Sequence, residues 1–276
     1  MVASPGEDAV YRMSVRCMGG LEAWVLRLLR QLAAALLLAA PSAAGPAAAA
    51  EMTAAEVVAL LAAHQGEGGP DLVNRDLAGL DLSQVDFRGA DLTGANLRRA
   101  NLQGANLSGA ILDLAILRGA DLSGASLRDA EAFQTVLAEA DLSGADLSGG
   151  NFVCNFENAK LDGANLAGAT MGADMRNQSM GLMRLSMYNA TLRNANLAGA
   201  DLSRGMLEFA DFSGANLAGA NLMRAEAAGA DFSGADMTGV NLTTADLQNA
   251  RFSGAKGIDT IIGLDQAVNR DRARFD

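Results

Sequence analysis

Large side chains are scarce in this chain of 276 residues. Aromatic residues make up only 4% of it, although half of all residues are hydrophobic, and alanine supplies much of that half. A conventional globular core needs more large side chains, because they fill a thick interior. The composition therefore favours a narrow core.

Residues that carry chemistry are equally few. The chain has two cysteines, Cys17 and Cys154, and one histidine, His64. Two distant cysteines form neither a disulfide framework nor a zinc-binding spacing, and we expect Cys154 to be a buried thiol. No nucleophile–base pair stands near His64, and no glycine-rich phosphate-binding loop occurs. We therefore expect no catalytic, cofactor or metal site, and no enzyme activity.

A period of five residues dominates what is present. In "GANLRRANLQGANLSGA", residues 94–110, Leu97, Leu102 and Leu107 each follow an Asn. Five residues turn a helix by about 140° net, which scatters the leucines around it. On a straight strand, an odd step alternates the faces. A chain that turns a corner in every unit can point each Leu inward, which is a β-solenoid.

The other positions of the unit fit a tight corner. Ala, two places before the central Leu, is small enough for a crowded interior, and Asp or Asn directly before it faces outward. Gly often follows, where a sharp turn needs a residue without a Cβ.

The units "ADLTG", "ANLRR", "ADLSG", "ANLAG" and "ADFSG" resemble the A-(D/N)-L-x-x motif of pentapeptide-repeat proteins. Central positions run from Leu72 to Phe252, about two-thirds of the chain. The resemblance implies an all-β fold, a right-handed quadrilateral parallel β-helix with four repeats per coil. The period alone does not choose four sides over three. The 37 central positions would then make about nine coils.

Residues 1–50 have the composition of a secretory leader. Arg27 and Arg30 precede a short apolar core at residues 32–40, then Pro41 and a run of small residues. Cleavage is expected after Ala50 or nearer Ala44. The apolar core is too short to span a bilayer, so we expect no membrane span in the mature form. The alternative is a disordered or membrane-surface segment on a cytosolic protein.

The ends of the repeat region read as caps. Residues 51–70 predict an N-terminal capping helix and linker: Thr53 and Glu56 form a capping box, and Gly66 can end the helix. The solenoid is expected over residues 71–256. Residues 257–276 break the period and predict a C-terminal cap with a short helix around Asp265–Arg272.

The repeat is irregular between Phe152 and Met187. Placing the central residues at 152, 156, 161, 166, 171, 175, 180 and 187 restores the phase at Leu192, which favours a local kink within one continuous column. Five methionines lie in this stretch, and we expect them to fill uneven packing rather than bind a metal: Met171, Met175, Met180, Met183 and Met187.

Apolar residues replace outward polar ones at one place. With coils of 20 residues, positions 131, 133, 134 and 136 stack on 111, 113, 114 and 116. The sequence therefore predicts one apolar patch, a candidate protein contact: Ile111, Leu114, Ile116, Phe133 and Val136. A loop or the N-terminal segment could instead cover it, or the repeats could simply have drifted. A weaker candidate patch consists of Met206, Phe209 and Met223.

Residues 51–276 hold 29 acidic and 17 basic side chains, a formal charge of −12. This charge argues against nucleic-acid binding. Asp81, Asp121 and Asp141 share one face with Asn101 between them, and Asp71 stacks on Asp91. We interpret these rows as a solvated wall rather than a cation site.

The function favoured by the sequence is a non-enzymatic rod that binds an unidentified protein and is exported to the periplasm or secreted. The resemblance implies an alternative, because some pentapeptide-repeat proteins mimic DNA and bind topoisomerases such as gyrase in the cytoplasm. Relatives also dimerise through C-terminal elements, and the tail after Gly257 could form a homodimer in this way.

Overall fold

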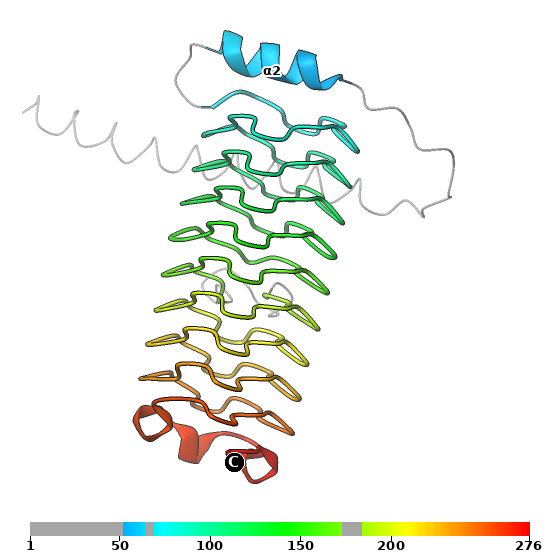
Figure 1. Ribbon diagram of the computed structural model, residues 1–276. Helices are drawn as coiled ribbons and strands as arrows, with labels where there is room; N and C mark the ends of the chain where they lie inside the picture. Colours follow the sequence, from blue (N-terminus) through cyan, green and yellow to red (C-terminus); the bar gives the residue numbers. More distant parts are fainter. Residues whose placement is uncertain (1–51, 65–68, 173–183) are drawn as a thin grey trace, which may run out of the picture. The chain divides into compact units, whose positions relative to one another are not determined.

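The computed structural model describes residues 52–64, 69–172 and 184–276 (Figure 1). The chain divides into two compact units, Met1–Ala48 and Ala49–Asp276, and all described residues belong to the second. The predicted leader over residues 1–50 lies outside the described residues, as do Met175, Met180 and Met183.

Parallel β-bridges join residues twenty positions apart through most of the second unit. Asp81 bridges to Asn101, which bridges in turn to Asp121. The Leu82 N–H donates to the Asn101 carbonyl at 2.7 Å, and the Asn101 N–H donates to the Leu80 carbonyl at 2.9 Å. Each coil is thus tied to the coils before and after it. The unit is a parallel β-helix, and its stacked coils are visible in Figure 1.

Each coil has four sides, because a bridge recurs in every five-residue unit and repeats after four units. We number the sides by their first bridging residues: Asp71 begins the first, Asp76 the second, Asp81 the third and Asp86 the fourth. Every side is a single bridge rather than an extended strand. The turn after it closes through a hydrogen bond such as Ala125 N–H to Leu122 O, at 3.0 Å.

The core is the stack of central side chains. Leu82, Leu102 and Leu122 lie directly above one another on the third side and are fully buried. The same column continues as Phe212, Phe232 and Phe252, whose rings stack at centroid distances of 5.2 and 5.0 Å. Alanines two positions before the central residues are buried too and form the rest of the interior. The narrow core expected from the composition is therefore present.

Helix α2, Ala54–Ala63, lies at the N-terminal end of the unit (Figure 1). The predicted capping box is present: the Glu56 N–H donates to Thr53 Oγ1 at 3.3 Å, and the Thr53 N–H donates to Glu56 Oε2 at 2.7 Å. Val57 is fully buried in the core cluster, with Leu60 and Leu61 packed against it. The helix ends at Ala63 with His64 as its C-cap, and the predicted stop at Gly66 lies outside the described residues.

The irregular stretch contains two separate changes. The side after Phe152 is one residue short, so Val136 bridges to Asn155. Thr170 then bridges to Asp201, and Asn155 to Ser186, a step of 31 residues. Met187 therefore follows Met171 on the next side, and the prediction of two further sides centred on residues 175 and 180 is wrong. The bridges across the insertion confirm that the column is continuous.

The C-terminal prediction of a short helix around Asp265–Arg272 is also wrong. The coil continues with sides of six residues, since the bridging positions are now Lys256, Ile262, Val268 and Arg274. Each side contains a turn of 3-10 helix: η1 Ile258–Thr260, η2 Leu264–Gln266 and η3 Arg270–Arg272. A left-handed residue precedes each turn: Gly257, Gly263 and Asn269. Phe275 then stacks on Phe252 at 4.8 Å and ends the internal aromatic column.

The Phe232→Ala variant should lower the free energy of unfolding by about 3–5 kcal/mol, because it removes a fully buried ring from the middle of this stack. Chemical denaturation followed by circular dichroism measures this. The neighbouring Ser233→Ala variant loses only a hydroxyl bond to Asp231, for which we expect about 1 kcal/mol. Equal effects of the two substitutions would contradict the central position of Phe232.

Candidate protein-contact surfaces

The residues that could carry chemistry do not gather into a centre. Within residues 52–64, 69–172 and 184–276, no group of three or more His, Cys, Asp or Glu side chains could hold a metal ion. The Cys154 thiol is buried and donates to the Ala132 carbonyl at 2.7 Å. Burial raises the pKa of Cys154 far above its usual value, so the thiol stays protonated and unreactive.

The acidic side chains have a structural task at the bridging positions. Asp81 Oδ1 accepts the backbone N–H of Ser83 at 3.2 Å, and Asp236 Oδ1 accepts that of Thr238 at 3.0 Å. Asparagine does the same, as Asn106 does for Ser108. These bonds fix the corner after each bridge, as Asx turns do. Part of the negative charge therefore follows from turn geometry.

Two turns that lack this acceptor obtain one from the preceding coil. Glu131 is the bridging residue before Phe133, and the Phe133 N–H donates instead to Asp113 Oδ1 at 2.9 Å. Thr191 has no carboxylate, and the Arg193 N–H donates to Asp162 Oδ1 at 3.0 Å. At these two corners an acceptor is thus present although the repeat motif is broken.

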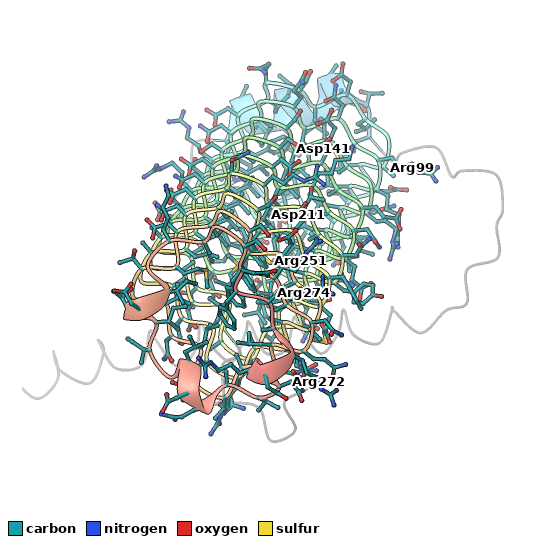
Figure 2. All side chains as sticks on the ribbon, turned by 60° about the horizontal axis from the view of Figure 1, so that its bottom comes forward. Arg99, Asp141, Asp211, Arg251, Arg272 and Arg274 are labelled. Atoms are coloured by element: carbon teal, nitrogen blue, oxygen red, sulfur yellow. The ribbon has the colours of Figure 1, made fainter. Side chains whose placement is uncertain are left out.

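Stacked carboxylates are separated or paired along the third side. The Asn101 amide donates to Asp81 Oδ1 at 2.9 Å, which relieves the repulsion expected between stacked acids. Asp121 and Asp141 are adjacent, and Lys160 lies 3.4 Å from Asp141 on the next coil. Asp141, Asp211, Arg251 and Arg274 follow one another along this side in Figure 2.

The main predicted patch is assembled as the 20-residue stacking requires. Ile116 bridges to Val136 on the second side, and Ile111 bridges to Glu131 on the first. Leu114 and Phe133 lie at the corner between these sides, where the Leu114 N–H donates to the Phe133 carbonyl at 2.9 Å. The five residues therefore wrap around one edge rather than covering a single wall. We call Ile111, Leu114, Ile116, Phe133 and Val136 the apolar corner.

The apolar corner is less exposed than its sequence positions suggest. Leu114 is only 6% exposed and has a left-handed backbone, with φ at 62°, while the other four side chains are half-buried. Asp113 beside it is also buried. The corner is thus a shallow apolar surface with Leu114 at its base.

The residues of the weaker patch lie on the second side and at the corners before and after it. Met206 is a half-buried bridging residue of the second side, and Met223 lies at the corner between the first and second sides. Phe209 lies at the next corner and contacts Tyr188, edge to face, with ring centroids 5.6 Å apart. Sequence reasoning missed Tyr188, because its position two residues after a bridging residue accepts many residue types.

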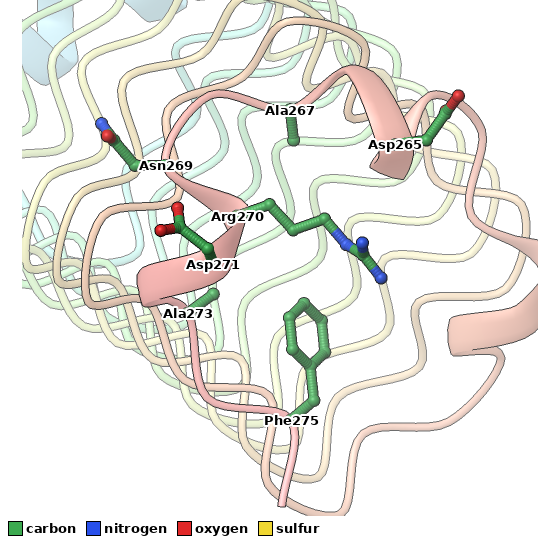
Figure 3. Close-up of a pocket in the computed structure, with 7 residues that line it drawn as sticks. All are labelled: Asp265, Ala267, Asn269, Arg270, Asp271, Ala273 and Phe275. Atoms are coloured by element: carbon green, nitrogen blue, oxygen red, sulfur yellow. The ribbon is translucent and has the colours of Figure 1, made fainter.

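Other exposed apolar side chains lie at the two ends of the unit. Val58 is exposed on α2, and Ile262, Val268 and Phe275 are exposed on the last coil. An open hollow of about 480 Å³ lies at the C-terminal end and is shown in Figure 3. Arg270 extends across it toward Phe275, with its guanidinium 5.9 Å from the ring centroid. This contact closes the end of the aromatic column and does not form an enclosed pocket.

No helix in the described part of the chain is long and apolar enough to cross a membrane.

A model of the pentapeptide repeat family matches the chain in eight copies, over residues 71–113, 115–152, 154–177, 186–222, 206–243 and 228–256. No curated protein sequence matches it. The matched copies include both stretches on either side of the insertion, in agreement with the continuous column.

Solved structures with similar sequences are also pentapeptide-repeat or resistance proteins. Full-length QnrB1, a plasmid-mediated fluoroquinolone resistance protein, is 23% identical over 67% of this chain and 90% of its own, with a TM-score of 0.46. HetL, a pentapeptide-repeat protein involved in heterocyst differentiation regulation in the cyanobacterium Nostoc sp., is 30% identical over 81% of this chain and 95% of its own, with a TM-score of 0.28. A pentapeptide-repeat protein from the Arabidopsis thaliana thylakoid lumen is 30% identical over 51% and 77%, with a TM-score of 0.13.

The Asp236→Asn variant tests the role of the acids at the corners. The hydroxyl and backbone N–H of Thr238 lower the pKa of the Asp236 carboxyl from its ordinary 3.8. A lowered folded-state pKa gives stability that is present above the unfolded value and is lost as the pH falls through the folded value. Asn keeps the acceptor but does not titrate. The melting temperature of Asp236→Asn should therefore be close to that of wild type at pH 7, and below pH 4 it should fall less than that of wild type. Asp236→Ala should lower the melting temperature at every pH, and identical pH profiles of wild type and Asp236→Asn would refute this role.

Proposed function

Because the chain belongs to the pentapeptide-repeat family, we propose that it is a non-enzymatic column that binds a protein partner on its outer walls. We also propose the right-handed winding that the family implies.

The observation that carries this proposal is the apolar corner. Ile111, Ile116 and Val136 occupy bridging positions where most other coils have Asp, Asn, Ser or Thr. Branched apolar side chains cannot accept the corner hydrogen bond that the polar residues accept, so the fold does not require them there. A contiguous apolar surface on an otherwise polar wall is typical of a contact with another protein.

The filled interior supports the same proposal. Central Leu, Phe and Met side chains occupy the column coil after coil, and those in the core cluster are almost completely buried. A core packed in this way leaves the outer walls as the surface on which specificity can be built. Binding is therefore proposed at the walls, through a few positions that depart from the repeat.

For the location of the protein we propose export. The support is the order of features in residues 1–50: basic residues, a short apolar core, and small residues ending at Ala50. The cytoplasmic alternative is a DNA-mimicking protein that binds a topoisomerase such as gyrase. It is favoured by the formal charge of −11 on the whole chain.

Site-specific photo-cross-linking in the native host tests the contact. A photoreactive phenylalanine at position 116 should give a discrete covalent adduct, because that side chain lies in the apolar corner. The same group at position 126, the bridging Ser of the fourth side, is the matched control and should give none. Adduct formation from position 116 should fall at least fivefold on Val136→Asp, since one buried aspartate at a contact costs about 1–3 kcal/mol.

The mass of the adduct separates the partners: twice the chain mass indicates a homodimer, and any other mass a different protein. Equal adducts from positions 116 and 126, or none from either, would refute the apolar corner as the contact.

The two locations are separated by the N-terminus of the native protein. Export predicts that purified native protein begins at Glu51, or close to residue 45, and is recovered in the periplasmic or secreted fraction. A cytoplasmic protein with an intact N-terminus that inhibits gyrase supercoiling in vitro would overturn export and support the DNA mimic.

A further inference from the structure

A pair of exposed aromatic rings lies at the corner between the second and third sides. Tyr188 is 46% and Phe209 56% exposed, and their rings meet edge to face. They belong to neighbouring coils, because the Asn189 N–H donates to the Glu208 carbonyl directly before Phe209, at 3.0 Å. Solvent exposure of two large rings is unfavourable in itself, so packing of this unit alone does not explain them.

The backbone of Phe209 gives a second reason to look beyond stability. Its φ is 60°, in the left-handed region that bulky residues rarely adopt. The equivalent positions of the coils on either side are Asn189 and Gly229, which adopt this conformation readily. A Cβ at Gly229 would lie 2.7 Å from the Phe209 ring, so the ring occupies the space beside Gly229 on the next coil. Phe209 is thus retained where Asn or Gly would fold with less strain.

Carboxylates surround this aromatic pair. Glu157, Tyr188 and Glu208 occupy the same position in successive coils, since the Asn158 N–H donates to the Tyr188 carbonyl at 3.0 Å and the Asn189 N–H to that of Glu208. Ser186 Oγ donates to Glu157 Oε1 at 3.4 Å. Glu226 of the second side forms an ion pair with Arg184, at 2.5 Å.

The local charge is negative. Three carboxylates, Glu157, Glu208 and Glu226, lie in this region, and among the described residues the ion pair of Arg184 supplies one compensating cation. Burial, and secondarily the nearby charge of Glu226, raise the pKa of Glu208, as expected where carboxylates are crowded. A cation bound beside Glu208 would relieve both effects.

We propose that Tyr188 and Phe209, flanked by Glu157 and Glu208, form a docking surface for an arginine-bearing basic segment of the partner protein. This inference rests on the proposed function and names the chemistry of the partner. A guanidinium plane can stack on an aromatic face while its N–H groups donate to a carboxylate. An apolar segment fits less well, because it would desolvate the carboxylates without pairing them.

A peptide probe tests the surface with the full chain. The probe is a fluorescein-labelled decapeptide of alternating arginine and glycine, titrated by fluorescence anisotropy. The Tyr188→Ser/Phe209→Asn variant keeps the net charge, and Asn suits the left-handed position. We expect its affinity to be about tenfold weaker than wild type, from the loss of two aromatic contacts to a cation.

The matched control is Ile262→Ser/Val268→Asn, which removes two exposed apolar side chains from the last coil without changing charge. Its affinity should stay within twofold of wild type. Unchanged circular dichroism and an unchanged or higher melting temperature of the Tyr188→Ser/Phe209→Asn variant would show that the fold is intact. A lysine–glycine decapeptide should bind more weakly than the arginine probe, because an ammonium group cannot stack as a plane.

Equal affinities of wild type and the Tyr188→Ser/Phe209→Asn variant would overturn the proposal, since the probe would then respond only to the acidity of the chain. Absence of binding to wild type would overturn it too. A variant that alters only sedimentation would identify the surface as a contact between copies and would likewise overturn it. Cross-linking from position 116 is independent of the peptide titration. A negative titration therefore leaves the proposed function intact, and a negative cross-linking result leaves the titration interpretable.

Discussion

The hydrogen-bond ladder between successive coils is the constraint on which the rest of this structure depends. Asn101 shows both halves of one bridge, because its N–H donates to Leu80 and its carbonyl accepts from Leu82, both in the preceding coil. A ladder of this kind holds only if every corner brings the chain back above itself. The left-handed residues at the corners serve that end, and so do the Asp and Asn acceptors at many of them. The inward Leu then falls on the Leu of the next coil.

This constraint changes how the negative charge should be interpreted. Asp236 accepts the Thr238 N–H, and at two corners without such an acceptor, Asp113 and Asp162 supply one from the preceding coil. An acid at a bridging position is therefore explained by the turn after it. Binding is better indicated by outward positions at which a polar residue would fit the fold but the chain has an apolar one. Ile116 and Phe209 are two such positions.

The sequence was sufficient for the fold and for most of its stacking. The five-residue step predicted the inward residues, and the four-sided coil implied by the family resemblance then paired Ile116 with Val136. Counting failed where several partitions are equivalent. The step of 16 residues from Met171 to Met187 can be divided into three sides or taken as one side with an insertion, and only the bridges from Asn155 to Ser186 and from Thr170 to Asp201 decide. The six-residue sides after Lys256 and the burial of Leu114 depend on neighbouring coils, which local patterns do not contain.

Sequence reasoning named Phe209 as an outward apolar residue but did not name Tyr188. Phe209 is conspicuous in the sequence because it replaces Gly or Asn, whereas Tyr188 occupies a position that accepts many residue types. Their contact follows from the regular 20-residue stacking beyond the insertion, where Ser186 bridges to Met206. The bridges from Asn155 to Ser186 and from Ser186 to Met206 keep the ladder intact on the coils that carry the aromatic pair. Two exposed rings on an undisturbed ladder favour a binding role over accidental drift of the repeat.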